Sequence, residues 1–204
     1  MNDPMIVKKS KKLSWLLRHG ANEAGLAMDA AGWARVEDVC RYLRMSEQLL
    51  DRVIAENNKG RLVRDGDRVR CCQGHSTANM PVTQEALEAS WDPWTGDGPI
   101  VHGTSVAAAH TILAEGIRAM ARTHVHLASD ESSKVGKRAA VAVLLDIDPT
   151  RIDGVWVSEN GVILAREVPA HAIVGVRGAT KNGRAAEAEL RARLSQSPGH
   201  HVAS

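Results

Sequence analysis

The chain has 204 residues, of which 44% are hydrophobic and 25% are charged, so its composition is that of a globular protein. This length allows one domain or two small lobes. The N-terminus lacks the apolar run and cleavage site of a signal peptide, and no apolar stretch approaches the about 20 residues of a membrane span. The three Cys residues cannot all pair, and the sequence predicts a cytoplasmic protein in a reducing compartment.

Charge is distributed unevenly along the chain. Residues 1–75 carry 14 Lys and Arg against 10 Asp and Glu, a net charge of +4, whereas the remainder is slightly acidic. This asymmetry suggests a polyanionic partner for the first part, although a solvated surface explains it equally well. The chain has five Trp, one Tyr and no Phe, which counts against a module that binds RNA mainly on an aromatic sheet face.

Residues 1–78 read as three helices followed by a hairpin. The first helix is expected at residues 10–18, where Leu recurs at helical spacing before Gly20. Two further helices are expected at residues 36–43 and after the cap residue Ser46, and a charged turn at residues 65–67 predicts the hairpin. This order resembles a winged-helix lobe, a fold that commonly binds nucleic acid.

Residues 79–98 are rich in Pro and Gly and read as a connector. The second lobe, residues 99–178, offers several strands and one helix at residues 105–115, which favours the α+β class. Residues 179–204 read as a variable tail with one helix. The sequence contains neither a GxGxxG nor a GxxxxGK[ST] motif, so a nucleotide would not be held as in Rossmann or P-loop proteins.

Four polar segments are candidates for chemistry, and each also has an ordinary structural explanation as a helix end, a turn or a strand. The His-x-His pattern in the last one lacks the companion motifs of a zinc site, and no GxSxG elbow is present, so we predict no metal and no serine triad. The four segments are Arg18-His19, residues 70–76, His102-Gly103-Thr104-Ser105, and residues 122–126.

Together these segments match one family in order. The chain resembles the RNA 2′-phosphotransferases (KptA, the tRNA 2′-phosphotransferases) over about residues 10–175. No single motif is specific, but the ordered set is. The matching segments are SKKLSWLLRH at residues 10–19, GW at 32–33, NKGRL at 58–62, VRCCQGHS at 69–76, VHGT at 101–104, RTHVHL at 122–127, VGKR at 135–138 and SENGV at 158–162.

The resemblance implies a fold and an activity. The fold would be an N-terminal winged-helix-like lobe that binds RNA and a C-terminal ADP-ribosyltransferase-like mixed β lobe that binds NAD. The activity would be NAD-dependent transfer of an internal RNA 2′-phosphate through a 2′-phospho-ADP-ribosyl RNA intermediate. The products would be 2′-OH RNA, nicotinamide and ADP-ribose 1″,2″-cyclic phosphate. The partner would be a 2′-phosphorylated, tRNA-like RNA, with no membrane or protein partner.

The resemblance also implies site residues. By the resemblance, Arg18, His19, Arg70 and Arg122 match the family's catalytic set. Arginine suits this role because its planar guanidinium donates to phosphate oxygens in a fork. The first three would come from the RNA-binding lobe and Arg122 from the NAD lobe, with the site in the cleft between lobes. The residues that would contact NAD, which acts as a co-substrate without a metal, are His102, Gly103, Thr104, Ser105, His126 and Arg138.

Two other functions remain open from the sequence. A mono-ADP-ribosyltransferase that modifies protein or nucleic-acid ends would keep His102-Gly103-Thr104 but would not need the arginine set. A non-enzymatic winged-helix RNA binder would release no nicotinamide.

Overall fold

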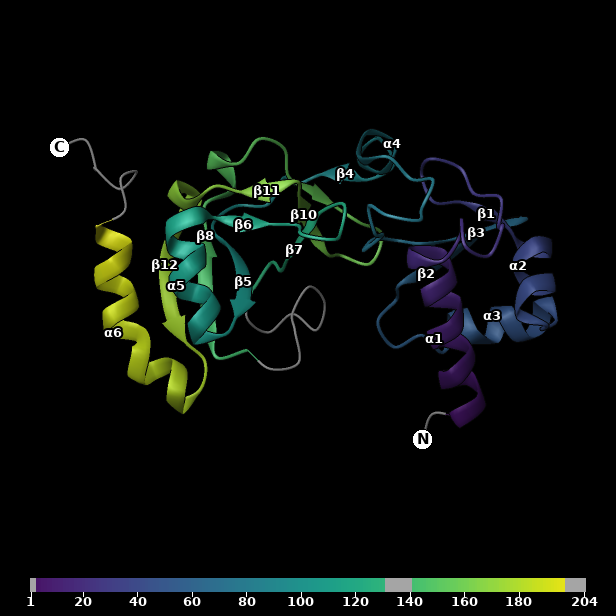
Figure 1. The fold of residues 1–204 in the computed structure, drawn as a ribbon, viewed down its shortest axis with the longest axis horizontal. Helices are drawn as coiled ribbons and strands as arrows, with labels where there is room; N and C mark the ends of the chain where they lie inside the picture. The colour runs from purple at the N-terminus through teal and green to yellow at the C-terminus, as the bar shows by residue number, and fades with distance from the viewer. Residues whose placement is uncertain (1–2, 131–140, 197–204) are drawn as a thin grey trace. The chain divides into compact units, whose positions relative to one another are not determined.

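The computed structural model describes residues 3–130 and 141–196, and this part of the chain is mixed α/β with six α-helices and several small antiparallel sheets (Figure 1). In chain order the elements are α1 (Pro4–His19), β1 (Ala34–Arg35), α2 (Val36–Leu43), α3 (Glu47–Ala55), β2 (Leu62–Asp65), β3 (Arg68–Cys71), α4 (Gln84–Glu88), β4 (Asp92–Pro93), β5 (Ile100–Thr104), α5 (Val106–Glu115), β6 (Ile117–Arg118), β7 (Val125–Leu127), β8 (Val143–Ile147), β9 (Trp156–Val157), β10 (Ile163–Ala165), β11 (Glu167–Val168), β12 (Ile173–Gly178) and α6 (Lys181–Ser195).

The chain divides into two compact units. The first comprises Met1–Asp92 together with two later segments, Met120–Thr123 and Ser158–Asn160. The second comprises Pro93–Ala119, His124–Val157 and Gly161–Ser204. Arg122, which the sequence led us to expect in the NAD lobe, therefore belongs to the first unit.

The helices of the first unit form where the sequence predicts them. α1 starts earlier than residue 10, because the Asp3 side chain accepts from the Met5 N–H and Pro4 occupies the first turn. Its leucines, Leu13, Leu16 and Leu17, are fully buried. α3 is capped by Ser46, whose hydroxyl accepts from the Leu49 N–H. The apolar faces of α1, α2 and α3 share one core with β2 and β3.

The predicted hairpin is present. β2 and β3 pair antiparallel with Leu62 opposite Cys71, and β1 adds to the other side of β3, giving the order β1-β3-β2. β3 is thus the central strand, and it delivers the chain directly to residues 72–76. The position of β3 therefore determines where residues 72–76 lie, beside the end of α1.

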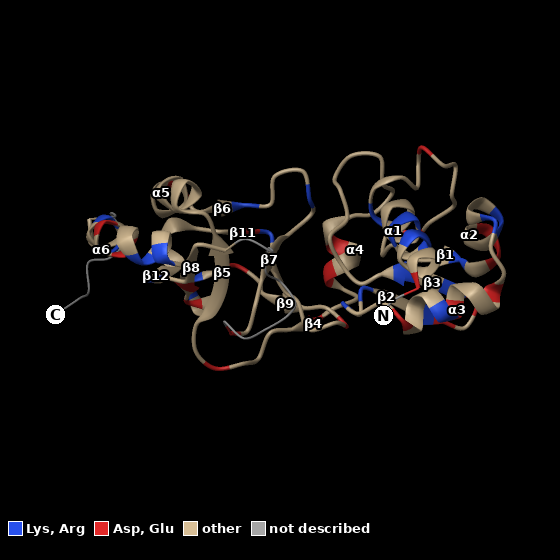
Figure 2. Ribbon diagram, turned by 90° about the horizontal axis from the view of Figure 1, so that it is seen from below, with Lys and Arg blue, Asp and Glu red and all other residues tan. Residues whose placement is uncertain are grey.

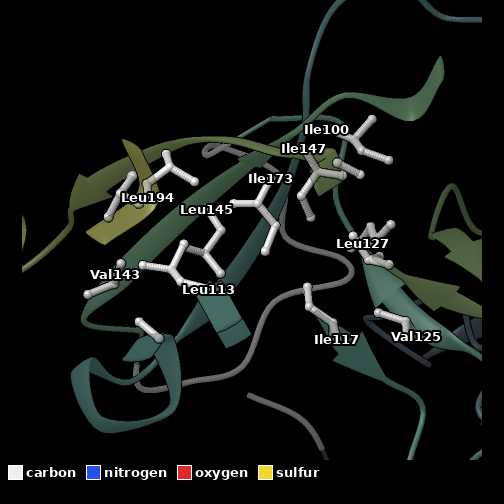
Figure 3. Close-up of a cluster of buried hydrophobic side chains, with 14 of the residues drawn as sticks. Ile100, Leu113, Ile117, Val125, Leu127, Val143, Leu145, Ile147, Ile173 and Leu194 are labelled. Carbon is white, nitrogen blue, oxygen red and sulfur yellow. The ribbon is translucent and has the colours of Figure 1, made fainter. Parts of the chain in front are cut away.

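The second unit is built on the antiparallel sheet β12-β8-β5 (Figure 3). β5 leads directly into α5, and Ser105 caps that helix by accepting from the Ala108 N–H. The strand-to-helix junction predicted for His102-Gly103-Thr104 is therefore confirmed. A second antiparallel group is formed by β9, β10 and β7.

α6 belongs to the second unit's core, although it lies in the segment that we expected to be a variable tail. Leu190 of α6 is buried in the second unit's core. Leu194 of the same helix lies in that cluster with Leu145 and Ile173 (Figure 3). The helix is further tied to β12, because Glu187 accepts from the Gly178 N–H at 2.8 Å. The apolar spacing of α6 is sparse, and sequence alone gave little sign of this packing.

None of the described helices has the length and apolar character needed to cross a membrane.

Candidate active site

The C-terminal turn of α1 positions Arg18 and His19. The helix carries five Lys and Arg and no acidic residue between Pro4 and His19 (Figure 2). Leu13, Leu16 and Leu17 bury one face of α1. On another face of the helix, residues three and four positions apart point in the same direction. The helix ends at Gly20, where a Cβ would collide with the indole of Trp15.

Arg18 is a buried cation with donors to spare. Its side chain is only 8% exposed, and its Nε–H donates to the Gly74 carbonyl at 3.1 Å. Among the described residues no other group accepts from this guanidinium. Gly74 has φ +87°, and a Cβ there would collide with the guanidinium, so both the backbone and the packing require glycine. The remaining Arg18 donors can bind an anion.

His19 and Arg122 meet at Ser76. The His19 Nδ1 lies 2.7 Å from the Ser76 Oγ, and the Ser76 N–H donates to the Arg18 carbonyl at 2.9 Å. On its other side Ser76 forms an antiparallel bridge with Arg122, an exposed residue. The structure therefore brings Arg18, His19 and Arg122 together in the first unit.

The bridge between Ser76 and Arg122 is flanked by two further hydrogen bonds. The Thr77 N–H donates to the Ala121 carbonyl at 3.1 Å, and the Thr123 N–H donates to the His75 carbonyl at 3.0 Å. This short ladder holds the Arg122 segment in the first unit and explains why Arg122 departs from the expected lobe.

A cavity of about 380 Å³, here called the α1 pocket, begins at Arg18 and His19. One wall is a stripe of residues along α1, and the other is the segment after α3. Its lining is Ile6, Val7, Ser10, Lys11, Ser14, Trp15, Arg18, His19, Glu56, Asn57, Asn58, Lys59 and Arg61.

Arg61 is a candidate site residue to which the sequence analysis gave no role. It lines the α1 pocket with Arg18, and its charge is close enough to lower the Arg18 pKa. Its own segment is held firmly: the Arg61 N–H donates to Asn57 Oδ1 at 3.0 Å, and the Asn57 amide donates to Ser10 Oγ at 3.0 Å. The signal was available, because Arg61 lies in the NKGRL match.

Arg70 is buried within the first unit. Its side chain is 3% exposed and forms an ion pair with Glu159. Its Nη1 donates to the Ala31 carbonyl at 3.0 Å and to Ser90 Oγ at 2.8 Å, and its guanidinium stacks 4.7 Å from the Trp33 ring centre. These partners satisfy a buried cation. Its catalytic role stays a prediction.

Electrostatics at the cluster favour an anion. Burial lowers the pKa of Arg18, and the nearby charges of Arg122 and Arg61 lower it further. Burial also lowers the pKa of His19, with Arg18 and Arg122 adding to the effect. Like charges held this close repel one another, and a bound phosphate would relieve that repulsion.

The predicted NAD contacts lie in the second unit. The His102 Nδ1–H donates to the His126 carbonyl at 3.2 Å, which orients the ring. Gly103 and Thr104 are buried at the end of β5, and a Cβ on Gly103 would collide with Val141. Ser105 caps α5. Arg138 lies outside the described residues.

No group of three or more His, Cys, Asp or Glu suited to a metal ion occurs among residues 3–130 and 141–196.

The ionisation of His19 gives a first prediction. Its imidazole should titrate below the ordinary value of 6.5, because burial and two arginines disfavour the charged form. The Arg122→Ala variant should raise that pKa, and inorganic phosphate should raise it as well. Histidine NMR titration, with His19→Gln to assign the signal, measures both. A wild-type pKa at or above 6.5, or no response to Arg122→Ala, would contradict this electrostatic account.

The Arg70 ion pair gives a second prediction. Glu159→Ala should lower the free energy of unfolding by about 3 kcal/mol, because it leaves a buried guanidinium without its carboxylate. Glu37→Ala removes an exposed partner of Arg41 and should change the unfolding free energy far less. Urea denaturation of both variants makes the comparison. Equal losses would show that the Arg70 pair contributes no more than a surface pair.

Comparison with known proteins identifies the family. The model of the family described as RNA 2′-phosphotransferase, Tpt1 / KptA family, matches residues 5–167. A probable RNA 2′-phosphotransferase of Burkholderia lata is 37% identical over 180 residues, covering 82% of this chain and 89% of that protein. One of Streptomyces griseus is 35% identical over 189 residues, covering 83% of this chain and 96% of that protein. The ordered motifs, the family match and these relatives agree, and the chain belongs to the RNA 2′-phosphotransferase family.

Proposed function

We propose that this protein removes an internal 2′-phosphate from RNA by transferring it to NAD⁺. The observation that carries the proposal is the cluster of Arg18, His19 and Arg122 around Ser76. The same proposal assigns a winged-helix-like fold to the first unit, supported by the element order α1-β1-α2-α3-β2-β3, and an ADP-ribosyltransferase-like fold to the second.

The cluster has the chemistry that a phosphomonoester needs. Such a group carries about −1.5 to −2 charges near pH 7 and presents three acceptor oxygens. Arg18 offers guanidinium donors that no described residue uses, and Arg122 and Arg61 add cations nearby. Arginine keeps its proton and donates in a planar fork, so the set suits both the ground state and the added charge of phosphoryl transfer.

The second unit offers groups that fit NAD⁺. A neutral His102 that donates through Nδ1 presents Nε2 as an acceptor, which suits a ribose hydroxyl. Val101 exchanges two hydrogen bonds with Ala128. Because alternate residues of a strand direct their backbone groups to the same side, the N–H and C=O of Gly103 also point away from β8. Both groups suit a carboxamide, which donates and accepts.

The proposed reaction has two steps. A 2′-phosphate oxygen attacks C1″ of the nicotinamide ribose, the bond from C1″ to nitrogen breaks, and nicotinamide leaves. The ribose O2″ then attacks phosphorus, the bond from phosphorus to the RNA O2′ breaks, and O2′ takes up the proton that O2″ loses. Arg18, His19 and Arg122 would hold the phosphate in both steps, and Arg122 would stabilise its added negative charge in the second.

The third prediction tests the reaction itself. Purified protein incubated with a 2′-phosphorylated oligoribonucleotide should remove the phosphate only when NAD⁺ is present. RNA mobility reports the loss of the phosphate, and chromatography of the small products should find nicotinamide and ADP-ribose 1″,2″-cyclic phosphate. Stable ADP-ribosylated RNA or protein would favour a mono-ADP-ribosyltransferase instead, and binding without nicotinamide release would favour a non-enzymatic RNA binder.

The fourth prediction concerns Arg122. In Arg122→Ala the second step should slow by about 10²–10³, the typical loss for one donor to a developing charge, so 2′-phospho-ADP-ribosyl RNA should accumulate. Gel analysis of single-turnover reactions measures this. Arg118→Ala removes an exposed arginine of β6 in the second unit and serves as the matched control. Normal turnover by Arg122→Ala would remove this residue from the mechanism.

A further inference from the structure

The α1 pocket extends well beyond the phosphate-binding cluster. Arg18 and His19 occupy one end of a stripe on α1, and the preceding pairs on the stripe are Ser14-Trp15 and Ser10-Lys11. Residues three and four apart lie on one helix face, so the pairs follow one another at about 5 Å per turn. The pocket therefore has room for more than a phosphate group.

The lining chemistry suits a nucleotide chain. Four cations, Lys11, Arg18, Lys59 and Arg61, face a single carboxylate, that of Glu56. The remaining polar lining consists of hydroxyl and amide groups, which can donate to and accept from sugar and base edges. Such a surface favours a polyanion with polar functional groups over an apolar ligand.

Trp15 supplies the aromatic surface that this pocket would otherwise lack. Its side chain is among the exposed large hydrophobic groups, with 40% of its area accessible, although it lies at the end of a well-packed helix. The indole occupies the space where a Cβ of Gly20 would be, so the ring is held against the backbone there. A ring that is held and exposed loses little conformational entropy when a flat group stacks on it.

The position of Trp15 relative to the cluster matches the proximity of a base to its neighbouring phosphate. Trp15 precedes Arg18 by three residues and His19 by four, one helical turn away. Lys11 lies one turn further, and Lys59 is held across the pocket by the Asn160 amide, which donates to its carbonyl at 3.0 Å. Base stacking on aromatic side chains is tolerant of sequence because every base has a π-face.

We propose that the α1 pocket is a nucleotide subsite in which a base adjoining the 2′-phosphate stacks on Trp15, while Lys11 and Lys59 contact a flanking phosphodiester. This inference rests on the proposed function and specifies how the RNA is held. A single exposed indole accommodates one base, so recognition is local and independent of base identity.

Binding measured without NAD⁺ tests the subsite, because no turnover then occurs. The probe is a short 2′-phosphorylated oligoribonucleotide, and a second probe lacks the bases on both sides of the phosphate. Trp15→Ala should weaken binding of the first probe about 5- to 150-fold and leave the abasic probe nearly unaffected. Trp15→Tyr should retain most of the affinity. Tyr42→Ala, which removes an exposed aromatic residue of α2 outside the pocket, is the matched control.

The outcomes separate this inference from the proposed function. Inorganic phosphate should bind wild type and Trp15→Ala equally, which also shows that the variant keeps the folded cluster. If wild type binds the abasic probe as tightly as the intact one, or if Trp15→Ala binds both as wild type does, the subsite is refuted even when phosphate removal proceeds. If wild type fails to remove the 2′-phosphate with NAD⁺, the proposed function itself fails.

Discussion

The arrangement of the candidate site depends on the hydrogen bonds of Ser76 and its two neighbours. The Ser76 N–H donates to the last turn of α1, and its hydroxyl lies against His19. Ser76 lies opposite Arg122 in a bridge whose hydrogen bonds are made by His75 and Thr77. This short segment thus ties together parts of the chain that are far apart in sequence. Each bond is of ordinary strength, but together they determine which cations approach one another, because a main-chain bridge leaves little freedom in where Arg122 lies.

That arrangement works against folding in the absence of a ligand. Burial lowers the pKa values of Arg18 and His19, so their charged forms are less favourable here than in water. The pKa of His19 is lower in the folded chain than its ordinary value of 6.5. Below pH 6.5 the unfolded chain therefore binds more protons at this residue than the folded chain does. His19 thus lowers the stability of the fold as the pH falls below 6.5. Under the proposed function, a dianionic phosphate would reverse the imbalance, and the unfavourable electrostatics of the unliganded cluster would add to its affinity for that ligand.

The sequence predicts elements governed by local pattern. The leucines of α1, the Ser46 cap of α3, the hairpin at Asp65-Gly66-Asp67 and the junction at His102 all follow from periodicity and turn chemistry. The unit to which Arg122 belongs could not be predicted, because the bridge to Ser76 joins residues 46 positions apart and leaves no local signal. The sequence did not indicate Arg61 as a candidate, because only the structure shows that it lines the same pocket as Arg18.

Arg61 and Arg70 show that residue type alone does not reveal what surrounds a side chain. Both are arginines of the same hairpin region, and both lie within segments that match the family. Arg70 is directed to Trp33, Glu159 and Ser90, which together neutralise and satisfy it. Arg61 instead lines the same pocket as Arg18, and the two positive charges repel one another. A buried arginine with several partners is held in one place by the fold, whereas cations that line one cavity repel one another and retain the capacity to bind an anion. The fold determines what surrounds each guanidinium, so residue type alone could not show this difference.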